Sequence, residues 1–188
     1  MSKASQLIVL CEDALHGTFV HRFLRKCGVP ERTIRIIPFP AGKGCGEQHV
    51  RTKYPEEIKA YRARRAKTVL IVIVDADSDT VDNRQLQLER AAQSAGVAPR
   101  SDGEFIVHLI PRRHIETWLA FLDGNDAVNE TTDFKSQYAF RKKPSDSHPL
   151  IGKFTEMFRQ RQQPLNCPPS LNKALDELEC LRETLQGT

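Results

Sequence analysis

Residues 68–80 have the sequence TVLIVIVDADSDT, in which an uninterrupted apolar run leads directly into a cluster of aspartates. Apolar residues fill positions 69–74, and such a run, rich in β-branched side chains, is typical of a strand buried on both faces of a parallel sheet. Asp75, Asp77 and Asp79 follow at alternating positions. Carboxylates this close together repel one another unless a positive charge lies among them. Since α/β proteins place their sites at the carboxyl ends of parallel strands, the stretch predicts a divalent-metal site.

Strands and helices are predicted to alternate along the first two thirds of the chain. Short apolar runs predict strands at residues 7–11, 34–37, 68–74 and 104–110. Apolar residues at helical spacing predict a helix after each strand, the last of them over residues 111–122. This order predicts an α/β fold with a mainly parallel four-stranded sheet, right-handed crossovers and helices on both faces.

The second part of the chain differs in character and predicts a small helical extension. We expect residues 1–123 to form the sheet domain that carries the catalytic groups, and residues 124–188 to form a polar loop region followed by helices. Amphipathic patterns at residues 150–158 and 170–185 predict two helices there. We expect this pair to pack on the sheet domain, and binding of a partner protein is the alternative.

Composition restricts the class of protein. The 188 residues carry 28 basic and 24 acidic side chains, and the net charge of +4 allows a nucleic-acid partner without requiring one. None of the five cysteines pairs as CxxC, so neither a zinc finger nor a disulfide framework is indicated. No stretch approaches the roughly 20 apolar residues of a membrane span, and the short apolar run near the start lacks the pattern of a signal peptide. We therefore expect a cytoplasmic protein with no membrane partner.

Acidic residues follow two of the predicted strands at the same expected edge of the sheet. Glu12 follows the first strand, and Asp75, Asp77 and Asp79 follow the third. If these strands are neighbours, the four carboxylates converge and offer the oxygen ligands that Mg²⁺ or Mn²⁺ takes. One or two such ions could support phosphodiester cleavage, with Glu12 as general acid or base beside Asp75 and Asp77. Alternatively, the aspartates cap the following helix and form a turn.

Basic residues near this edge are predicted to contact phosphate groups. Lys43 lies in the glycine-rich segment GKGCG, which is not a P-loop but could place backbone N–H groups and the lysine against a phosphate; a flexible turn is the alternative. Arg84 falls one turn into the helix after the aspartates and faces either the site or solvent. Arg112 and Arg113 directly follow the fourth strand and could hold a phosphate backbone.

Two residues beside these arginines are further candidates for the site. Glu116 begins the helix after the fourth strand, so it is either a catalytic or metal-coordinating carboxylate or an exposed glutamate favoured by the helix dipole. None of the six histidines has the HxH or HxxxH spacing of a metal site. His114 flanks Glu116 and is the one histidine that we would test.

Glu12 after a first strand and the sequence DADSD at residues 75–79 after a later strand resemble the Toprim domain, in which a glutamate is followed some tens of residues later by DxD. The resemblance covers about residues 6–120 and implies a Toprim/Rossmann-like fold. It also implies that Glu12 is the general acid or base and that the first two aspartates bind Mg²⁺, with the third as a further candidate. The chain departs from the family in one respect, because Asp13 stands where a glycine often follows the glutamate.

Toprim proteins include topoisomerases, primases, overcoming-lysogenization-defect nucleases and small RNA-maturation nucleases. The segments GKGCGEQ and IPRRHIETWL are also similar to those of small stand-alone Toprim-like proteins of bacterial defence loci, which are often thought to act beside an ATPase. A chain of 188 residues has no room for the additional domains of a topoisomerase or a primase. The resemblance therefore implies a Mg²⁺- or Mn²⁺-dependent nuclease that acts on DNA or RNA, with an ATPase as partner.

Two other functions stay open. A haloacid-dehalogenase-like phosphatase also uses a strand ending in DxD, although its motif normally lies near the N-terminus and has Thr or Val where this chain has Asp79. A non-catalytic or conditionally active metal-binding subunit or toxin of a defence complex would keep the same acidic site. The oligomeric state, including a homo-oligomer, is open as well.

Overall fold

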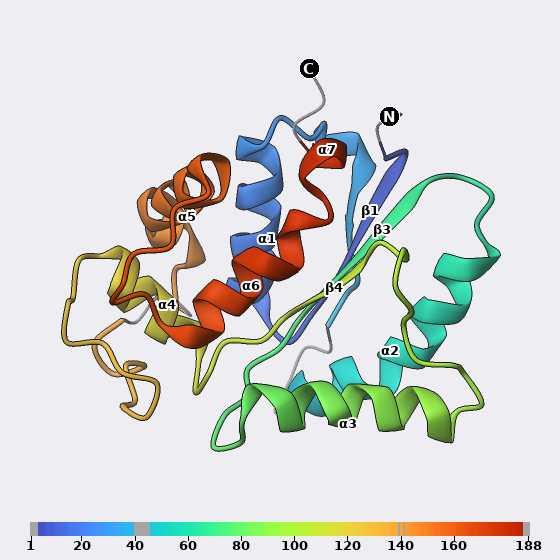
Figure 1. Cartoon of the computed structure of the whole chain (residues 1–188), viewed down its shortest axis with the longest axis horizontal. Coiled ribbons are helices and arrows are strands. Elements are labelled where there is room, and N and C mark those ends of the chain that lie inside the picture. The colour runs from blue at the N-terminus through green and yellow to red at the C-terminus, as the bar shows by residue number, and fades with distance from the viewer. Residues whose placement is uncertain (1–3, 40–45, 139, 141, 186–188) are drawn as a thin grey trace.

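The computed structural model describes residues 4–39, 46–138, 140 and 142–185. Its centre is a sheet of four parallel strands in the order β2-β1-β3-β4. The strands are β1 (Gln6–Cys11), β2 (Ile34–Ile36), β3 (Thr68–Ile73) and β4 (Ile106–Leu109). Every strand expected from the sequence is present, so the predicted α/β fold with a parallel four-stranded sheet is confirmed (Figure 1).

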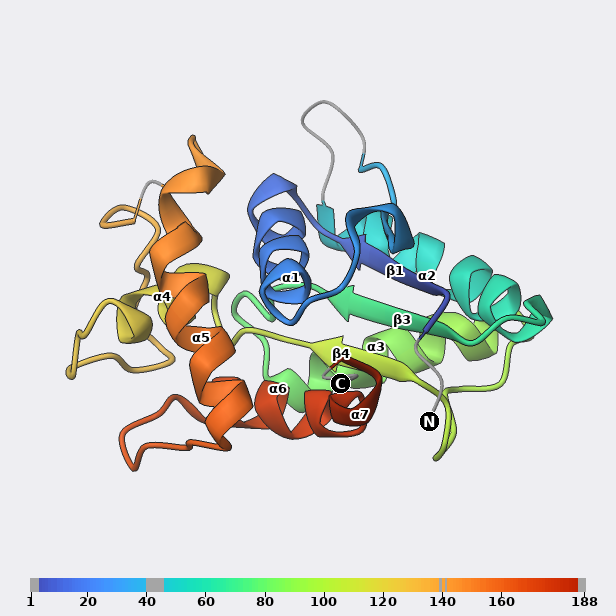
Figure 2. The same ribbon diagram turned by 90° about the horizontal axis from the view of Figure 1, so that it is seen from above.

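Helices cover both faces of the sheet, as the sequence predicts (Figure 2). They are α1 (Ala14–Lys26), α2 (Gly46–Ala63), α3 (Val81–Ser94), α4 (Ile115–Leu122), α5 (His148–Gln160), α6 (Pro169–Glu179) and α7 (Arg182–Leu185). Successive strand residues point to opposite faces, so each face has its own apolar cluster. Ile8 and Leu10 of β1 belong to the cluster with α2 and α3, whereas Leu7 and Val9 belong to the cluster with α1, α4, α5 and α6. None of the helices in the described ranges is long and apolar enough to span a membrane.

One predicted helix is divided in the structure, and another begins before its first buried apolar residue, Val50. Helix α2 begins at Gly46, next to the glycine-rich segment, and continues through Pro55. The single helix predicted over residues 170–185 is divided into α6 and the short α7, with a turn at Cys180 and Leu181 between them. The early start of α2 matters for the site, because it brings the first residue of this helix against the end of β1.

The helices of the predicted extension share the core of the sheet. Phe154 of α5 lies 4.9 Å from Phe19 and 5.2 Å from Phe23 of α1, measured between ring centroids. Trp118 Nε1 of α4 donates a hydrogen bond to Ser170 Oγ of α6 at 2.8 Å. The boundary after residue 123 therefore stays a prediction, because one apolar cluster extends across it.

Helix α6 also covers the outer edge of β4. Glu177 accepts a hydrogen bond from His108 N at 3.1 Å, and Arg100 donates one to Ile106 O at 2.9 Å. Arg100 and Glu177 in turn form an ion pair, with Nη2 and Oε1 at 2.7 Å. Side chains thereby satisfy backbone groups that an edge strand would otherwise leave unpaired.

Candidate metal centre

The carboxyl ends of β1 and β3 lie side by side, because these strands are neighbours with Cys11 opposite Ile73. Glu12 and Asp75 follow these ends, and the Glu12 carboxylate accepts a hydrogen bond from Asp75 N at 3.0 Å. The structure thus brings together the two acidic residues that the sequence assigns to different strands.

Asp77 reaches the same place through an uncommon backbone conformation. Its φ is +53°, and Arg113 in the loop after β4 has a φ of +63°. The two residues form an antiparallel bridge in which Asp77 N donates to Arg113 O at 3.0 Å. Left-handed conformations of non-glycine residues cost energy and are concentrated at functional sites. The bridge joins the loops after β3 and β4 and so places Asp77 beside His114.

His114 faces both aspartates. It is buried, with 7% of its surface exposed, and its Nδ1 lies 3.5 Å from Asp75 Oδ2 and 3.5 Å from Asp77 Oδ1. These separations are too long for good hydrogen bonds, and Nδ1 has no hydrogen-bond partner among the described residues. Two donor atoms bound to one cation at about 2.1 Å are roughly 3.0–3.4 Å apart. These three residues, which we call the His114 group, therefore have the spacing of ligands that share an ion.

A further carboxylate lies near the second nitrogen of the same ring. Asp133 Oδ2 is 3.8 Å from His114 Nε2. Metal-binding histidines commonly present their second ring nitrogen to a carboxylate, which fixes the ring and its tautomer. Asp133 belongs to the segment predicted as polar loops, where no local pattern distinguishes it from the other acidic residues.

A second set of acidic and imidazole side chains consists of Glu12, His16 and Asp75, and we call it the His16 group. His16 is fully buried, with Nε2 2.9 Å from Asp75 Oδ1 and Nδ1 2.8 Å from Asp13 Oδ1. Burial alone would lower the pKa of His16, but the charge of Asp75 and the hydrogen bonds to Asp13 and Asp75 raise it well above its usual value. The ring is then protonated at both nitrogens, so it donates to both carboxylates and has no lone pair for a metal.

Asp75 connects the two groups. Its Oδ1 accepts hydrogen bonds from His16 and, at 2.9 Å, from Ile115 N at the start of α4. Its Oδ2 faces His114. These contacts hold the carboxylate, which has no exposed surface, in one orientation.

Glu12 has the properties of a proton-transfer group. Burial raises the pKa of its carboxyl group, the charge of Asp75 raises it further, and His16 opposes both. A raised carboxyl pKa suits a general acid or base. The start of α2 packs closely on this residue, because a Cβ added to Gly46 would lie 2.4 Å from Glu12 Cγ and 2.5 Å from Glu12 O. Glycine is therefore required at this contact, and α2 helps to fix where Glu12 lies.

Asp79 has a different environment from the other two aspartates. It accepts hydrogen bonds from Thr80 N and Asn83 Nδ2, both at 2.8 Å, and from Gln87 Nε2 at 2.9 Å. These hydrogen bonds lower the pKa of Asp79, with the largest contribution from Asn83 and the next from Thr80. The structure places Asp79 in neither ligand group, and its contacts at the start of α3 match the helix-capping alternative.

Arg84 is buried and faces the site rather than solvent, and its predicted contact with phosphate stays a prediction. Its Nη1 lies 2.8 Å from Glu47 Oε1 of α2, and its Nη2 lies 3.5 Å from Asp77 Oδ2. Nη2 also donates to Ala76 O at 3.3 Å. The guanidinium group therefore ties α2 and α3 to the loop that carries Asp77.

Of the remaining predicted residues, the three that the structure describes lie near this edge and join neither ligand group. Glu116 is completely buried in the first turn of α4, so the alternative of an exposed glutamate is wrong. Arg112 and Arg113 are half-buried in the loop after β4, and Arg112 N donates to Ser170 Oγ at 3.1 Å. Lys43 lies outside the described residues.

The sequence patterns did not identify Asp13 and His16. Asp13 is the N-cap of α1 and accepts hydrogen bonds from Leu15 N and His16 N. A polar residue before an apolar helical pattern is a recognisable capping signal, so Asp13 could have been found. His16 had no such signal, because its partner Asp75 is 59 positions away along the chain.

Comparison with known proteins adds no family assignment. No protein-family model, no curated protein and no solved structure matches the chain. The resemblance to the Toprim domain therefore stays a prediction that rests on Glu12 and residues 75–79.

Proposed function

We propose that the chain is a divalent-metal-dependent nuclease of Toprim type that hydrolyses phosphodiester bonds of DNA or RNA. The observation that carries this proposal is the His114 group. The buried His114 Nδ1 makes no hydrogen bond to a described residue, yet it lies 3.5 Å from an oxygen of both Asp75 and Asp77. A cation shared by the three side chains accounts for this spacing and satisfies the buried nitrogen.

The donor set favours Mn²⁺ over Mg²⁺. Carboxylate oxygens suit both ions, whereas Mg²⁺ prefers oxygen ligands and an imidazole nitrogen suits transition metals. When bound, a divalent cation polarises a phosphoryl oxygen and lowers the pKa of a coordinated water. Asp75, Asp77 and His114 would hold the ion, and the Asp77 side chain, which is 44% exposed, is the most accessible of the three.

Glu12 supplies the proton-transfer group of the proposed reaction. It lies against the backbone of Asp75, and burial together with the charge of Asp75 raises the pKa of its carboxyl group, which suits a general acid or base. In hydrolysis it takes the proton of the attacking water or gives one to the leaving oxygen. His16 and Ile115 N keep Asp75 in place while this happens.

A phosphatase that forms a phosphoaspartate is less well supported. Such an enzyme needs a carboxylate oxygen that can reach and attack the phosphorus atom. Asp75, the first aspartate of the DxD sequence, has no exposed surface, and its Oδ1 is held by His16 and Ile115 N. We therefore favour attack by water over attack by Asp75.

The experiment incubates the purified protein and Mn²⁺ or Mg²⁺ with plasmid DNA, linear DNA, RNA and a generic phosphomonoester. We expect metal-dependent cleavage of a polynucleotide, which Asp77→Ala abolishes and Asp82→Ala retains. Asp82 is the matched control because it is an exposed aspartate of α3 outside both ligand groups. Release of phosphate from the monoester alone would contradict the proposal, as would equal losses in the two variants.

Metal binding without cleavage would favour the conditionally active subunit instead. The same substrates would then be tested again with the product of a neighbouring gene, where that gene encodes an ATPase. Cleavage that appears only in the mixture and still requires Asp77 would assign the chemistry to this chain and the trigger to its partner.

A further inference from the structure

A cavity of about 620 Å³ opens beside α1, and none of the roles described above uses it. Its walls come from α1, from the end of β2 with Phe39 beyond it, and from His148 at the start of α5. Along α1 the lining residues are spaced so that they share one face of the helix. They include Ala14, Thr18, Arg22 and Arg25.

The cavity carries a net positive charge. Arg25 Nε lies 3.1 Å from one carboxylate oxygen of Glu31, and His21 Nε2 lies 2.7 Å from the other. Glu31 therefore compensates the positive charge of Arg25. Arg22 is exposed and forms no hydrogen bond or ion pair with any described residue, so its charge is uncompensated. Burial lowers the pKa of His148, and the charge of Arg22 adds to this lowering while Asp146 opposes it.

An aromatic ring lies on the wall of the same cavity. Phe39 lines the cavity and is 37% exposed, so its ring can be reached by a bound ligand. Single-stranded nucleic acids are bound where basic groups hold the backbone and aromatic rings stack with the bases. A volume of about 620 Å³ is also within the range of pockets that enclose a ligand of nucleotide size.

One end of the cavity is close in sequence to residues of the candidate site. Ala14 lines the cavity and directly follows Glu12 and Asp13, while His16, two residues further along α1, is directed to Asp75 on the buried side. At 1.5 Å per residue, Arg22 lies about 12 Å further along the helix axis than Ala14. A strand with one phosphate at the metal centre could therefore extend along α1 to Arg22.

We propose that this cavity binds an unpaired nucleotide of a single-stranded nucleic acid, with the base against Phe39 and the backbone phosphate at Arg22. This inference rests on the proposed nuclease function and specifies its substrate as single-stranded. In a duplex both faces of a base are stacked, so the ring of Phe39 could not reach one without unpairing it.

The experiment measures binding without cleavage, by fluorescence anisotropy in the presence of a chelator. The probes are a short labelled oligothymidylate, the corresponding oligouridylate and a duplex of the same length, with dTMP as a competitor. We expect both single strands to bind more tightly than the duplex. Phe39→Ala should weaken single-strand binding by roughly 5- to 100-fold, the usual value of one stacked base. Arg22→Ala should reduce the slope of log affinity against log salt by about 0.7, the value of one phosphate contact.

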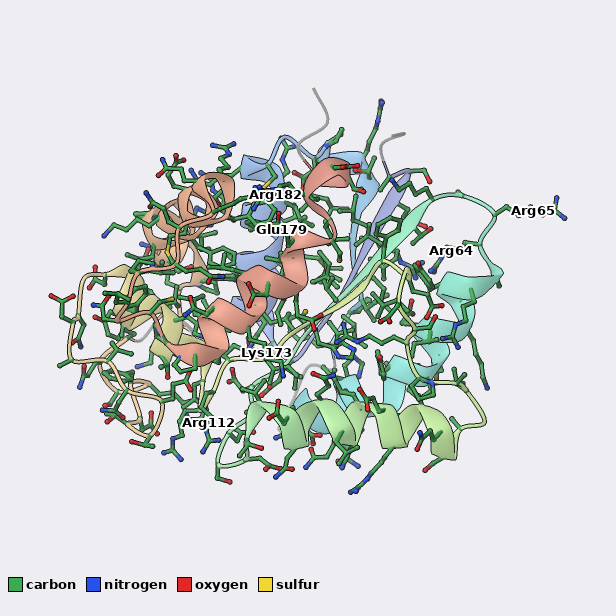
Figure 3. All side chains as sticks on the ribbon, viewed as in Figure 1. Arg64, Arg65, Arg112, Lys173, Glu179 and Arg182 are labelled. Carbon is green, nitrogen blue, oxygen red and sulfur yellow. The ribbon has the colours of Figure 1, made fainter. Side chains whose placement is uncertain are left out.

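Arg65→Ala is the matched control. Arg65 is exposed in the loop between α2 and β3, at the opposite edge of the sheet from the metal centre, and extends into solvent (Figure 3). The Arg65→Ala substitution removes the same charge as Arg22→Ala, but it should leave the salt dependence of strand binding unchanged. If neither Arg22→Ala nor Phe39→Ala exceeds the effect of Arg65→Ala, the inference is wrong.

Two other results would also overturn the inference. If the duplex binds as tightly as the single strands, the cavity does not recognise an unpaired base. If dTMP displaces the labelled strand at the same concentration as an unlabelled oligonucleotide does, the cavity binds free nucleotides instead. The experiments distinguish failure of this inference from failure of the proposed nuclease function. If the protein binds single strands in a Phe39-dependent manner but does not cleave them, only the nuclease function is contradicted. If cleavage depends on Asp77 but Phe39→Ala does not change strand binding, only the role of the cavity is contradicted.

Discussion

The His16 group and the His114 group contain the same functional groups, two carboxylates and an imidazole, and they share Asp75, but their distances differ. In the first, each ring nitrogen of His16 lies within 2.9 Å of a carboxylate oxygen, since Nε2 contacts Asp75 within the group and Nδ1 contacts Asp13 next to it. In the second, Nδ1 lies 3.5 Å from two such oxygens. The shorter distances are formed hydrogen bonds, whereas the longer ones leave room for a common partner. The imidazole of the His16 group is satisfied by hydrogen bonds to Asp13 and Asp75, whereas that of the His114 group can accept a cation.

The His16 group orients the carboxylate that it shares with the His114 group. A buried carboxylate such as Asp75 tends to take up a proton unless a positive charge lies next to it. His16, whose pKa is raised well above its usual value by the charge of Asp75 and by its hydrogen bonds, lies next to Asp75 and holds Oδ1, so that Oδ2 is directed to His114. The difference in distance therefore indicates a division of roles, in which His16 orients the carboxylate and His114 coordinates the metal.

Replacement of His16 should have the largest effect, and it acts on stability. His16→Ala leaves the buried carboxylate of Asp75 without its charged partner, so we expect the free energy of unfolding to fall by about 3–5 kcal/mol. Urea denaturation in the absence of divalent metal measures this loss.

His114→Ala is the matched control for that experiment. Because Nδ1 of His114 makes no hydrogen bond to the described residues, its removal should destabilise the metal-free protein clearly less than His16→Ala does. Equal losses would show that both histidines are structural partners of Asp75, and the distinction between the two groups would not hold.

Removal of His114 should have the next largest effect, and it acts on metal binding. His114→Ala should weaken Mn²⁺ binding at least roughly 10-fold and Mg²⁺ binding by less, because the imidazole contributes more to the transition metal. Isothermal titration calorimetry measures both affinities. Mn²⁺ at about 100 times its Kd should stabilise the wild type by about 2.7 kcal/mol, and the same concentration should stabilise the variant far less. An unchanged Mn²⁺ affinity would remove His114 from the site.

The sequence predicts those parts of the site that follow from the sheet itself. The apolar run of β3 identifies a buried strand, and the run of β1 identifies a second one. Once the strands are parallel and adjacent, their carboxyl ends lie at one edge whatever loops follow. The convergence of Glu12 and Asp75 could therefore be predicted from the position of each residue relative to its strand.

The sequence does not predict contacts between loops and helices that are distant in the chain. The bridge between Asp77 and Arg113 needs two non-glycine residues in left-handed conformations, which no local propensity indicates. His16 and Asp133 come to the site from α1 and from a segment without regular pattern. Periodicity describes neighbours within a turn or a strand, so it identified the edge of the sheet and, from its place after β4, His114, but it did not identify His16.

Replacement of Asp79 should have the smallest effect, and it separates helix capping from metal binding within one short sequence. Asp79→Ala removes the acceptor for Thr80 N, Asn83 and Gln87 and should lower the melting temperature by no more than a few degrees, with Mn²⁺ affinity unchanged. Calorimetric titration alongside Asp77→Ala compares two carboxylates that are two residues apart. A loss of Mn²⁺ affinity as large as that of Asp77→Ala would make Asp79 a ligand, as the sequence predicts. The loop after β3 would then have to release three hydrogen bonds when the ion binds.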